Sequence, residues 1–329
     1  LPRVTHFQNS FELLGDSTAT FKTFLRKIAH AKKHIYIQTY ILGKDRVSRT
    51  VLARLAEKAR EGVQVLLLYD AVGSRRAWKQ TRALREAGGR VVRFAPSLLN
   101  FKWSVSANLR NHRKIAIFDG TQAIIGGQNL EVAGMGPHHR KEVNVDFSAL
   151  IGGPVVGTLT RTFVSDWCFA AEQAPESFAE QISYVPPPAG ETILEAIASG
   201  PDLAGDVLWE RILLLIASAQ ETCTLITPYF IPDEVTFRNI ELKAKAGTHV
   251  RLIVPEHSDH KLIDVACNSY LHTLEKAGCE ILLYRGEQLL HAKLVTVDHR
   301  QALIGSVNLD MRSLFVNFEI GLSIESVPE

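Results

Sequence analysis

The chain has 329 residues, a hydrophobic fraction of 46% and a mean hydropathy of +0.02, which indicate a globular protein of one large domain or two of ordinary size. No stretch approaches the roughly 20 consecutive apolar residues that are needed to span a bilayer. The net charge of +2 combines a basic first part, residues 1–172 with 26 Lys and Arg against 13 Asp and Glu, with an acidic second part, residues 173–329 with 11 against 22.

The first part alternates predicted strands and helices, which favours an α/β fold with a largely parallel sheet covered on both faces. The apolar alternation, the β-branched runs and an N-cap at Asp16 define the elements. We expect an edge strand at Phe11–Gly15, a helix to Ala31, a strand at His34–Leu42, a helix at Ser48–Glu61, a strand at Val63–Tyr69, a helix at Trp78–Ala87 and a strand at Arg90–Phe94.

The predicted helix at Trp78–Ala87 lies in the densest basic run of the chain, and two interpretations stay open. The run is either a solvated helix face that also attracts the acidic part, or a surface held against anionic lipid headgroups. Nucleic acid would use the same electrostatic field. The run consists of Arg75, Arg76, Lys79, Arg82, Arg85, Arg90 and Arg93.

The segment Ala95–Leu109 interrupts the alternation of strands and helices. It has no acidic residue, and it places Phe101 and Trp103 beside Lys102. Such a composition suits either a loop whose apolar residues enter the core or, if it is exposed, a lip that touches the membrane interface.

The next predicted strands are His112–Phe118 and Ala123–Gly127, joined by a turn at Asp119–Gly120, and then Val143–Ile151 before a helix that ends near Ala171. Residues 173–203 contain three consecutive prolines and several glycines, and we expect them to be an irregular linker. The predicted units are therefore residues 1–172, the linker 173–203 and residues 204–329.

The second part repeats the plan of the first. Its predicted elements are a helix at Val207–Gln220, a strand at Thr222–Tyr229, a helix at Asp233–Ala246, a strand at His249–Pro255, a helix at Lys261–Ala277, a strand at Glu280–Tyr284, two motif strands, and Phe318–Ile324, which closes the sheet. We infer two similar α/β/α halves related by a pseudo-twofold axis.

A five-position motif occurs once in each half with identical spacing, and this is the strongest signal in the sequence. The motif reads His-x-Lys, four residues, Asp, six residues, Gly, two residues, Asn. Chance repetition of five fixed positions within one chain is improbable, so the two copies indicate one shared site. The copies are His112, Lys114, Asp119, Gly126 and Asn129, and His291, Lys293, Asp298, Gly305 and Asn308.

At these residues the chain resembles the phospholipase D superfamily, and within it the bacterial cardiolipin synthases. Further matching stretches are Pro228–Asp233, Ser258–His260 and Asn308–Ser313. The resemblance implies two phospholipase D-like halves with the active site at their interface, no cofactor and no metal. It also implies association with the bacterial inner membrane, either peripheral or through segments outside this chain, and it leaves the oligomeric state open.

Both motifs suit the cleavage of a phosphodiester. Lys114 and Lys293, with the amides of Asn129 and Asn308, can stabilise charge on the nonbridging oxygens. One neutral histidine can attack phosphorus while the other protonates the leaving alkoxide. The resemblance favours His112 as the nucleophile and His291 as the acid.

Each histidine needs a partner on its second ring nitrogen. The candidates are Asp146 and Glu319, which occupy equivalent places about thirty residues after each motif histidine. Asp119 and Asp298 are expected to anchor turns rather than to take part in the chemistry.

Three further residues are candidates for substrate binding. Ser306 has no counterpart in the first motif, where Gly127 stands, and we expect this difference to alter substrate contacts. Tyr229 and His260 fall in the stretches that match the family.

A metal site and a disulfide framework are both disfavoured. His257 and His260 with Asp259 are accompanied by no other ligand cluster, and the chemistry of the motifs needs no metal. The four cysteines show no C-x-x-C spacing, so buried reduced thiols are expected.

The predicted reaction is transfer of a phosphatidyl group from phosphatidylglycerol or phosphatidylethanolamine to phosphatidylglycerol, at an anionic phospholipid membrane surface. The alternative is a phospholipase D-type hydrolase of phospholipids or of other phosphodiesters. Nucleic acid is the less favoured substrate because no aromatic-rich groove for a single strand is evident.

Overall fold

The computed structural model describes residues 4–94 and 109–325, so the predicted membrane lip at Ala95–Leu109 lies almost entirely outside the described residues. The first half contains β1 (His6–Leu14), α1 (Ser17–His30), β2 (His34–Thr39), α2 (Arg46–Arg60), β3 (Gln64–Asp70), η1 (Trp78–Thr81), α3 (Arg82–Glu86), β4 (Arg90–Phe94), β5 (Ile115–Phe118), β6 (Gln122–Gly126), α5 (Val132–Met135), β7 (Ser148–Gly152) and α6 (Val155–Ala171).

After the short helices η2 (Pro175–Phe178) and α7 (Ala179–Ser183), the second half follows the same plan. It contains β8 (Thr192–Ser199), α8 (Val207–Ser218), β9 (Thr222–Ile226), β10 (Phe230–Ile231), α9 (Glu234–Lys245), β11 (His249–Pro255), α10 (Lys261–Lys276), β12 (Glu280–Tyr284), β13 (Leu294–Val297), β14 (Gln301–Gly305), β15 (Leu309–Asp310), α11 (Met311–Phe315) and β16 (Glu319–Glu325).

Local sequence signals explain where the helices begin. The carboxylate of Asp16 accepts a hydrogen bond from the backbone N–H of Ala19 at 2.7 Å, which confirms the predicted N-cap of α1. Asp45 and Asp233 cap α2 and α9 in the same way. The predicted helix at Trp78–Ala87 is a 3₁₀ turn followed by one short α-helix.

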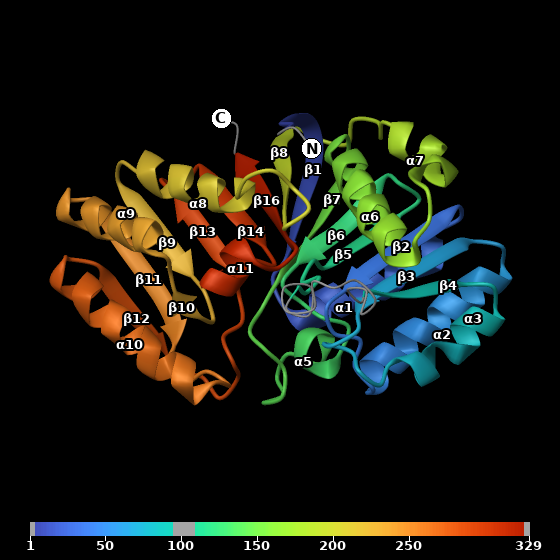
Figure 1. Cartoon of the computed structure of the whole chain (residues 1–329), viewed down its shortest axis with the longest axis horizontal. Coiled ribbons are helices and arrows are strands. Elements are labelled where there is room, and N and C mark those ends of the chain that lie inside the picture. Colours follow the sequence, from blue (N-terminus) through green and yellow to red (C-terminus); the bar gives the residue numbers. More distant parts are fainter. Residues whose placement is uncertain (1–3, 95–108, 326–329) are drawn as a thin grey trace, which may run out of the picture.

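The main sheet has 14 strands in the order β12-β11-β9-β13-β14-β16-β8-β1-β7-β6-β5-β2-β3-β4. Read outward from β8 and from β1, the two halves show the same order, which confirms the predicted repeat (Figure 1). The sheet is mixed: the outer three strands of each half are parallel, and their inner neighbours are antiparallel. The parallel part is confined to the edges because each motif folds as a tight hairpin, β5–β6 or β13–β14.

Three predictions about the middle of the chain were wrong. The strand expected at an edge, β1, lies between β7 and β8, and the strand expected to close the sheet, β16, lies between β14 and β8. The segment 173–203 is not irregular throughout, because it includes β8, which pairs with β16 along its length. The adjacent prolines obscured this strand, whose Leu194 and Ala196 face the core.

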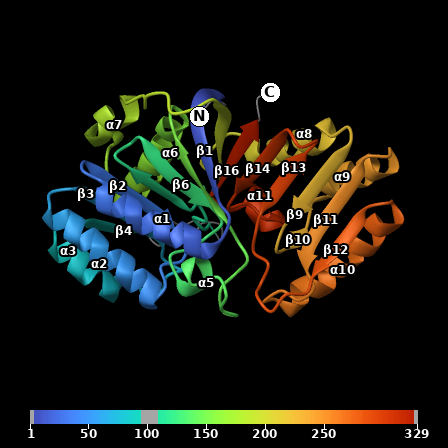
Figure 2. The same ribbon diagram turned by 180° about the vertical axis from the view of Figure 1, so that it is seen from behind.

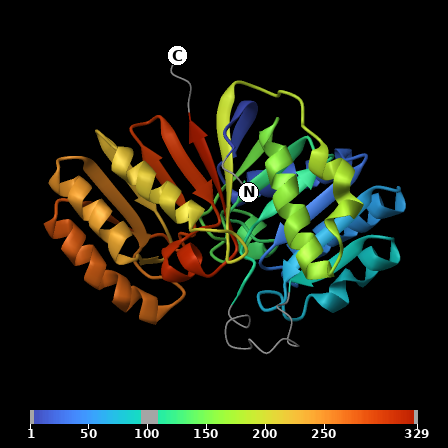
Figure 3. The same ribbon diagram turned by 45° about the horizontal axis from the view of Figure 1, so that its top comes forward.

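The halves share part of their core. In the first half, α1 and α2 cover one face of the sheet and α6 the other; α8, α9 and α10 cover one face of the second half (Figures 1 and 2). Phe163 of α6 belongs to the same buried cluster as Ile304 and Leu322 of the second half. Figure 3 shows both halves diverging from the central strands. Burial across the junction therefore couples the two halves.

The described residues contain neither a helix that could cross a membrane nor a disulfide bond. Within residues 4–94 and 109–325, no helix combines the length and apolarity required to cross a membrane. All four cysteines are buried free thiols.

Candidate active site

The two motif histidines lie where the halves meet. Each stands just ahead of the first strand of its hairpin, and its backbone N–H donates to the opposite half. His112 donates to the carbonyl of Phe318 at 2.9 Å, and His291 donates to the carbonyl of Val145 at 2.9 Å. These equivalent bonds tie each motif to the other half.

The histidine side chains are also paired across the junction. Nδ1 of His112 lies 3.0 Å from Glu319, and Nδ1 of His291 lies 2.8 Å from Asp146. Each carboxylate belongs to the half opposite its histidine. In the tautomer in which Nδ1 donates to the carboxylate, the Nε2 atom of each ring remains for chemistry. Lys293 Nζ also lies 2.9 Å from Nδ1 and 3.4 Å from Nε2 of His291.

Both carboxylates are held by further donors. Glu319 is fully buried and accepts from the hydroxyl of Ser306 and from the amide of Asn317 at 3.3 Å. Asp146 accepts from the N–H of Phe147 at 2.8 Å. These bonds fix the orientation of the carboxylates and, through them, of the imidazoles.

The electrostatics of the site favour neutral histidines in the free protein. Burial lowers the pKa of His112, although the charge of Glu319 opposes this shift. Burial and then the charge of Lys293 lower the pKa of His291 to about 4. Burial alone would raise the pKa of Glu319, but the attraction of His112 holds it below its ordinary value.

The motif lysines are buried beneath the histidines. Lys114 is 4% exposed and Lys293 is 3% exposed, and each Nζ donates to the carbonyl of its own motif histidine. Burial lowers the pKa of Lys114 to about 7 and that of Lys293 to about 8. Neither is among the described residues that line the cavity.

A cavity of about 780 Å³ separates the two motifs, a volume typical of small-molecule sites. His112, His291, Asn129 and Asn308 all line it. Asn129 Oδ1 accepts from the N–H of Ile41 at 3.1 Å, whereas Asn308 Oδ1 has no hydrogen-bond partner among the described residues. The structure thus brings together both histidines and both amides of the duplicated motif.

Tyr229 and His260, predicted to bind substrate, also line this cavity. Their rings lie 5.9 Å apart, and the hydroxyl of Tyr229 donates to Asp259 at 2.6 Å. In the first half, the ring of Tyr40 contacts His112 edge-on at 4.9 Å. One tyrosine from each half therefore forms a wall of the cavity.

The prediction for Ser306 was wrong for the free protein. Ser306 is fully buried and donates to Glu319, so it supports the carboxylate instead of facing the cavity. The equivalent Gly127 has no space for a side chain, because a Cβ there would lie 2.6 Å from the Asp146 carboxylate. The difference between the motifs therefore affects how the carboxylates are held, and not a direct substrate contact as predicted.

The other motif positions serve the hairpins. Asp119 accepts from the N–H groups of Lys32, Lys33 and His34, and Asp298 accepts from those of residues 220–222. Both aspartates have positive φ, near 50°. These contacts provide a physical basis for the predicted anchoring role.

The motif glycines allow close strand packing. A Cβ on Gly126 would lie 2.5 Å from Ser148 Oγ, and a Cβ on Gly305 would lie 2.2 Å from the Ile320 carbonyl. Gly305 also has φ of +157°, which L side chains rarely adopt.

Two groups escaped the sequence analysis. Arg113 is 1% exposed; it pairs with Asp166 at 2.6 Å and donates to the carbonyl of Glu319 at 3.0 Å, so it joins the halves behind His112. No pattern marks it, since its counterpart is Ala292.

The second group is Glu131, which lines the cavity and corresponds in the repeat to Asp310. Asp310 caps α11, whereas the N–H of Val132, which starts α5, donates to Asp45 at 2.7 Å. The side chain of Glu131 therefore does not cap α5. Burial, and then the negative charge of Asp45, raise the pKa of Glu131 to about 7. Alignment of Asn129-Leu-Glu with Asn308-Leu-Asp would have found it.

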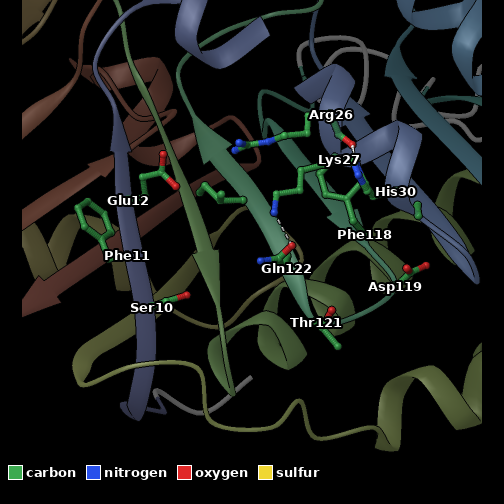
Figure 4. A pocket seen from close by; sticks show the side chains of 12 residues that line it. Ser10, Phe11, Glu12, Arg26, Lys27, His30, Phe118, Asp119, Thr121 and Gln122 are labelled. Carbon is green, nitrogen blue, oxygen red and sulfur yellow. Dashed lines mark hydrogen bonds between the residues drawn. The ribbon is translucent and has the colours of Figure 1, made fainter. Parts of the chain in front are cut away.

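A separate cavity of about 490 Å³ lies between α1 and the neighbouring strands (Figure 4). Lys27 donates there to Gln122 at 2.6 Å. Among the motif residues only Asp119 lines this cavity, so the chemistry belongs to the larger one. Across the described ranges, no group of three or more His, Cys, Asp or Glu residues could hold a metal ion.

Comparisons with known proteins agree with this geometry. The family described as cardiolipin synthase, phospholipase D-like domain, matches residues 24–167 and 212–329, one segment in each half. The cardiolipin synthase of Geobacillus sp. (strain WCH70) is 35% identical over 94% of this chain and 61% of its own length. The major cardiolipin synthase ClsA of Bacillus subtilis (strain 168) is 32% identical over 97% of this chain and 66% of its own length.

The chain therefore spans about three-fifths of the length of the curated relatives that it matches. Among solved structures, the phosphatidylserine synthase of Haemophilus influenzae Rd KW20 has a TM-score of 0.74 at 17% identity, covering 99% of this chain and 84% of that one, which shows a common fold. The duplicated motif, the repeated halves and the family match together show that the chain belongs to the phospholipase D-like family of cardiolipin synthases.

Proposed function

We propose that the protein transfers a phosphatidyl group between phospholipids, with phosphatidylglycerol or phosphatidylethanolamine as donor and phosphatidylglycerol as acceptor. The observation that supports this most directly is the pair of histidines, each oriented by a carboxylate of the other half, on one cavity. The names and sequence similarity of the relatives support the choice of lipid substrates. No cofactor enters the proposal.

In the first step, Nε2 of neutral His112 attacks phosphorus and forms a P–N bond. The P–O bond to the donor headgroup breaks, and His291 gives its proton to the leaving alkoxide. In the second step, His291 takes the proton of the acceptor hydroxyl, whose oxygen attacks phosphorus and releases His112.

The residues around the histidines support both steps. The negative phosphodiester favours the charged form of His291, which burial disfavours in the free protein. Lys114 Nζ donates to the carbonyl of His112, and Lys293 Nζ donates to the carbonyl of His291 and lies 2.9 Å from its Nδ1. Each ammonium group has three N–H donors, so each can also meet a nonbridging oxygen with the amides of Asn129 and Asn308.

The choice of His112 as nucleophile follows the family resemblance, because each histidine is paired with a carboxylate of the other half. The two differ in that Lys293 Nζ also lies 2.9 Å from Nδ1 of His291. Acid quenching during turnover, followed by peptide mass spectrometry, tests it. A phosphatidyl adduct on the peptide of His112 supports the assignment, and an adduct on the peptide of His291 reverses it.

The proposed reaction is tested with phosphatidylglycerol vesicles, purified protein and mass spectrometry of the lipid products. Cardiolipin and glycerol are expected from the wild type and absent with His112→Ala and His291→Ala. His139→Ala, an exposed histidine outside the cavity, is the matched control and retains activity. Phosphatidic acid without cardiolipin would show that water is the acceptor and that the protein is a hydrolase.

We also propose a location at the bacterial inner membrane, either peripheral or through segments outside this chain, supported by the lipid substrates of the proposed reaction. Residues 1–172 and 204–329 would form the two catalytic halves, with β8 (Thr192–Ser199) of the connecting segment added to the second, and each half contains one of the two segments that match the family.

A further inference from the structure

We propose that the mouth of the catalytic cavity docks on an anionic phospholipid bilayer through two patches, one from each half. This inference rests on the proposed function, because it assumes a lipid substrate. We call these two patches together the docking surface. It consists of Val72, Arg75, Arg76, Trp78 and Lys79 from the first half and Leu262 and Val265 from the second.

The first patch lies beside the wall of the cavity. Strands β2, β3 and β4 are parallel, so the segments that follow them emerge at one edge of the sheet. Tyr40 and Ile41, which follow β2, line the cavity. The hydroxyl of Ser74, which follows β3, accepts from the N–H of Leu42 at 2.9 Å and donates to the carbonyl of Tyr40 at 3.0 Å. The basic segment is therefore fixed next to the site.

The second patch lies at the start of α10. Strands β9, β11 and β12 are also parallel, and the segment after β11 leads into α10 at the cavity edge. His260 and Ile263 line the cavity, while Leu262 is 87% exposed and Val265 is 72% exposed. Farther along the same helix, Leu271 and Leu274 are buried. Only the turn nearest the cavity presents its aliphatic side chains to solvent.

The internal repeat makes the two patches equivalent. β3 and β11 occupy the same position in their halves, so the segments after them lie on opposite sides of the shared cavity. Figure 1 shows α3 and α10 on either side of the molecule. A flat surface that contacts both patches would face the cavity mouth, and a headgroup would reach the histidines without the acyl chains leaving the bilayer.

The chemistry of the patches matches an anionic bilayer. The ring of Trp78 is 38% exposed and is held by the guanidinium groups of Arg85 at 4.1 Å and Arg93 at 5.2 Å. An indole held in this way suits the headgroup region, and the exposed Arg75, Arg76 and Lys79 attract lipid phosphates.

The second half is acidic, and a hydrogen bond does not remove the charge of a carboxylate, so its patch contributes apolar rather than electrostatic attraction to the bilayer. Asp259 accepts from Tyr229, and Asp264 accepts from the N–H of Ser258 at 3.1 Å. Leu262 and Val265 provide apolar contact there, because aliphatic side chains that enter the acyl boundary strengthen binding in proportion to the area buried. The basic patch and the aliphatic patch thus contribute different forces to one surface.

Flotation with vesicles of equimolar phosphatidylglycerol and phosphatidylcholine tests the proposal on the whole chain. The double variant Leu262→Ser/Val265→Ser is expected to lose about ten-fold in vesicle partition. The matched control is Val185→Ser/Leu242→Ser, whose side chains are 73% and 63% exposed outside the cavity; it should bind like the wild type. Arg75→Glu/Lys79→Glu should weaken binding mainly at low salt.

Turnover of a short-chain phosphatidylglycerol kept below its critical micelle concentration separates this proposal from the proposed function. The serine variant should retain wild-type turnover of that soluble substrate while losing activity on vesicles. No turnover by the wild type would reject the proposed function, and the flotation result would still decide the docking surface.

Two results would overturn the docking surface. One is equal vesicle binding by the wild type and both variants of the patches. The other is self-association of the wild type in lipid-free buffer that the Leu262→Ser/Val265→Ser variant abolishes, because the aliphatic patch would then belong to a contact with a second copy.

Discussion

Replacement of Glu319 by glutamine tests whether each histidine depends on its carboxylate from the other half. The fully buried carboxylate lies 3.0 Å from Nδ1 of His112, so it stabilises the imidazolium that forms during catalysis. Glutamine has nearly the same shape and can still accept a hydrogen bond, but it carries no charge. The substitution therefore isolates the electrostatic contribution of the carboxylate.

The magnitude follows from the geometry. Unit charges about 4 Å apart at an effective dielectric constant of about 20 attract each other by about 4 kcal/mol. Loss of that stabilisation in the transition state corresponds to about a 1,000-fold decrease in kcat. Because the charge of Glu319 raises the pKa of His112, its removal should also move the inflection that belongs to His112 in the pH–rate profile to lower pH.

The assay is turnover of a soluble short-chain phosphatidylglycerol between pH 5 and 9, with thermal unfolding of each variant measured in parallel. Glu325→Gln, an exposed glutamate on the same strand, is the matched control and should leave kcat unchanged. A loss below about ten-fold in a stably folded Glu319→Gln variant, with no movement of the inflection, would refute the electrostatic role.

Three further predictions concern charge and stability. Competitive inhibition by inorganic sulfate, whose charge is constant over this range, should weaken as pH rises through 7 to 8, because Lys114 and Lys293 lose their charge with pKa values of about 7 and about 8; pH-independent inhibition would contradict this. In urea titrations at pH 7, Asp119→Asn should lower the free energy of unfolding by about 1 to 2 kcal/mol. Backbone N–H groups outweigh burial and lower the pKa of this carboxyl from 3.8, so its contribution is complete above pH 3.8 and the difference should shrink as the pH falls from 3.8 towards the lowered pKa. Arg113→Met should cost about 3 to 5 kcal/mol because it leaves Asp166 buried and unpaired, and adding Asp166→Leu should recover part of that loss; no recovery would place the cost in packing alone.

Much of the site could be predicted from the sequence because duplication supplied an internal comparison. The spacing of the two motifs identified the residues that meet at the cavity, and the equivalence of Asp146 and Glu319 identified them as the histidine partners. Which carboxylate serves which histidine was not predictable, since each follows a histidine of its own half by about thirty residues. The packing of the two halves against each other determines which carboxylate pairs with which histidine.

The errors in the fold also arose at that junction. Local patterns predict strands but not their neighbours, so β1 and β16 were expected at edges although both lie in the middle of the sheet. Ser306 was expected in the cavity because a hydroxyl near a motif suggests substrate binding. Its burial against Glu319 depends on a tertiary contact that motif spacing does not encode.

Because each histidine is paired with a carboxylate of the other half, catalysis also requires that the two halves stay in contact. Neither half contains a complete histidine–carboxylate pair, so loosening of the shared core at the junction by a few ångströms would disable both rings at once, while the clusters that lie within one half stayed packed. Heat inactivation should therefore precede melting of secondary structure. Fragments cut within residues 173–191, before β8, should be inactive apart and regain turnover when mixed.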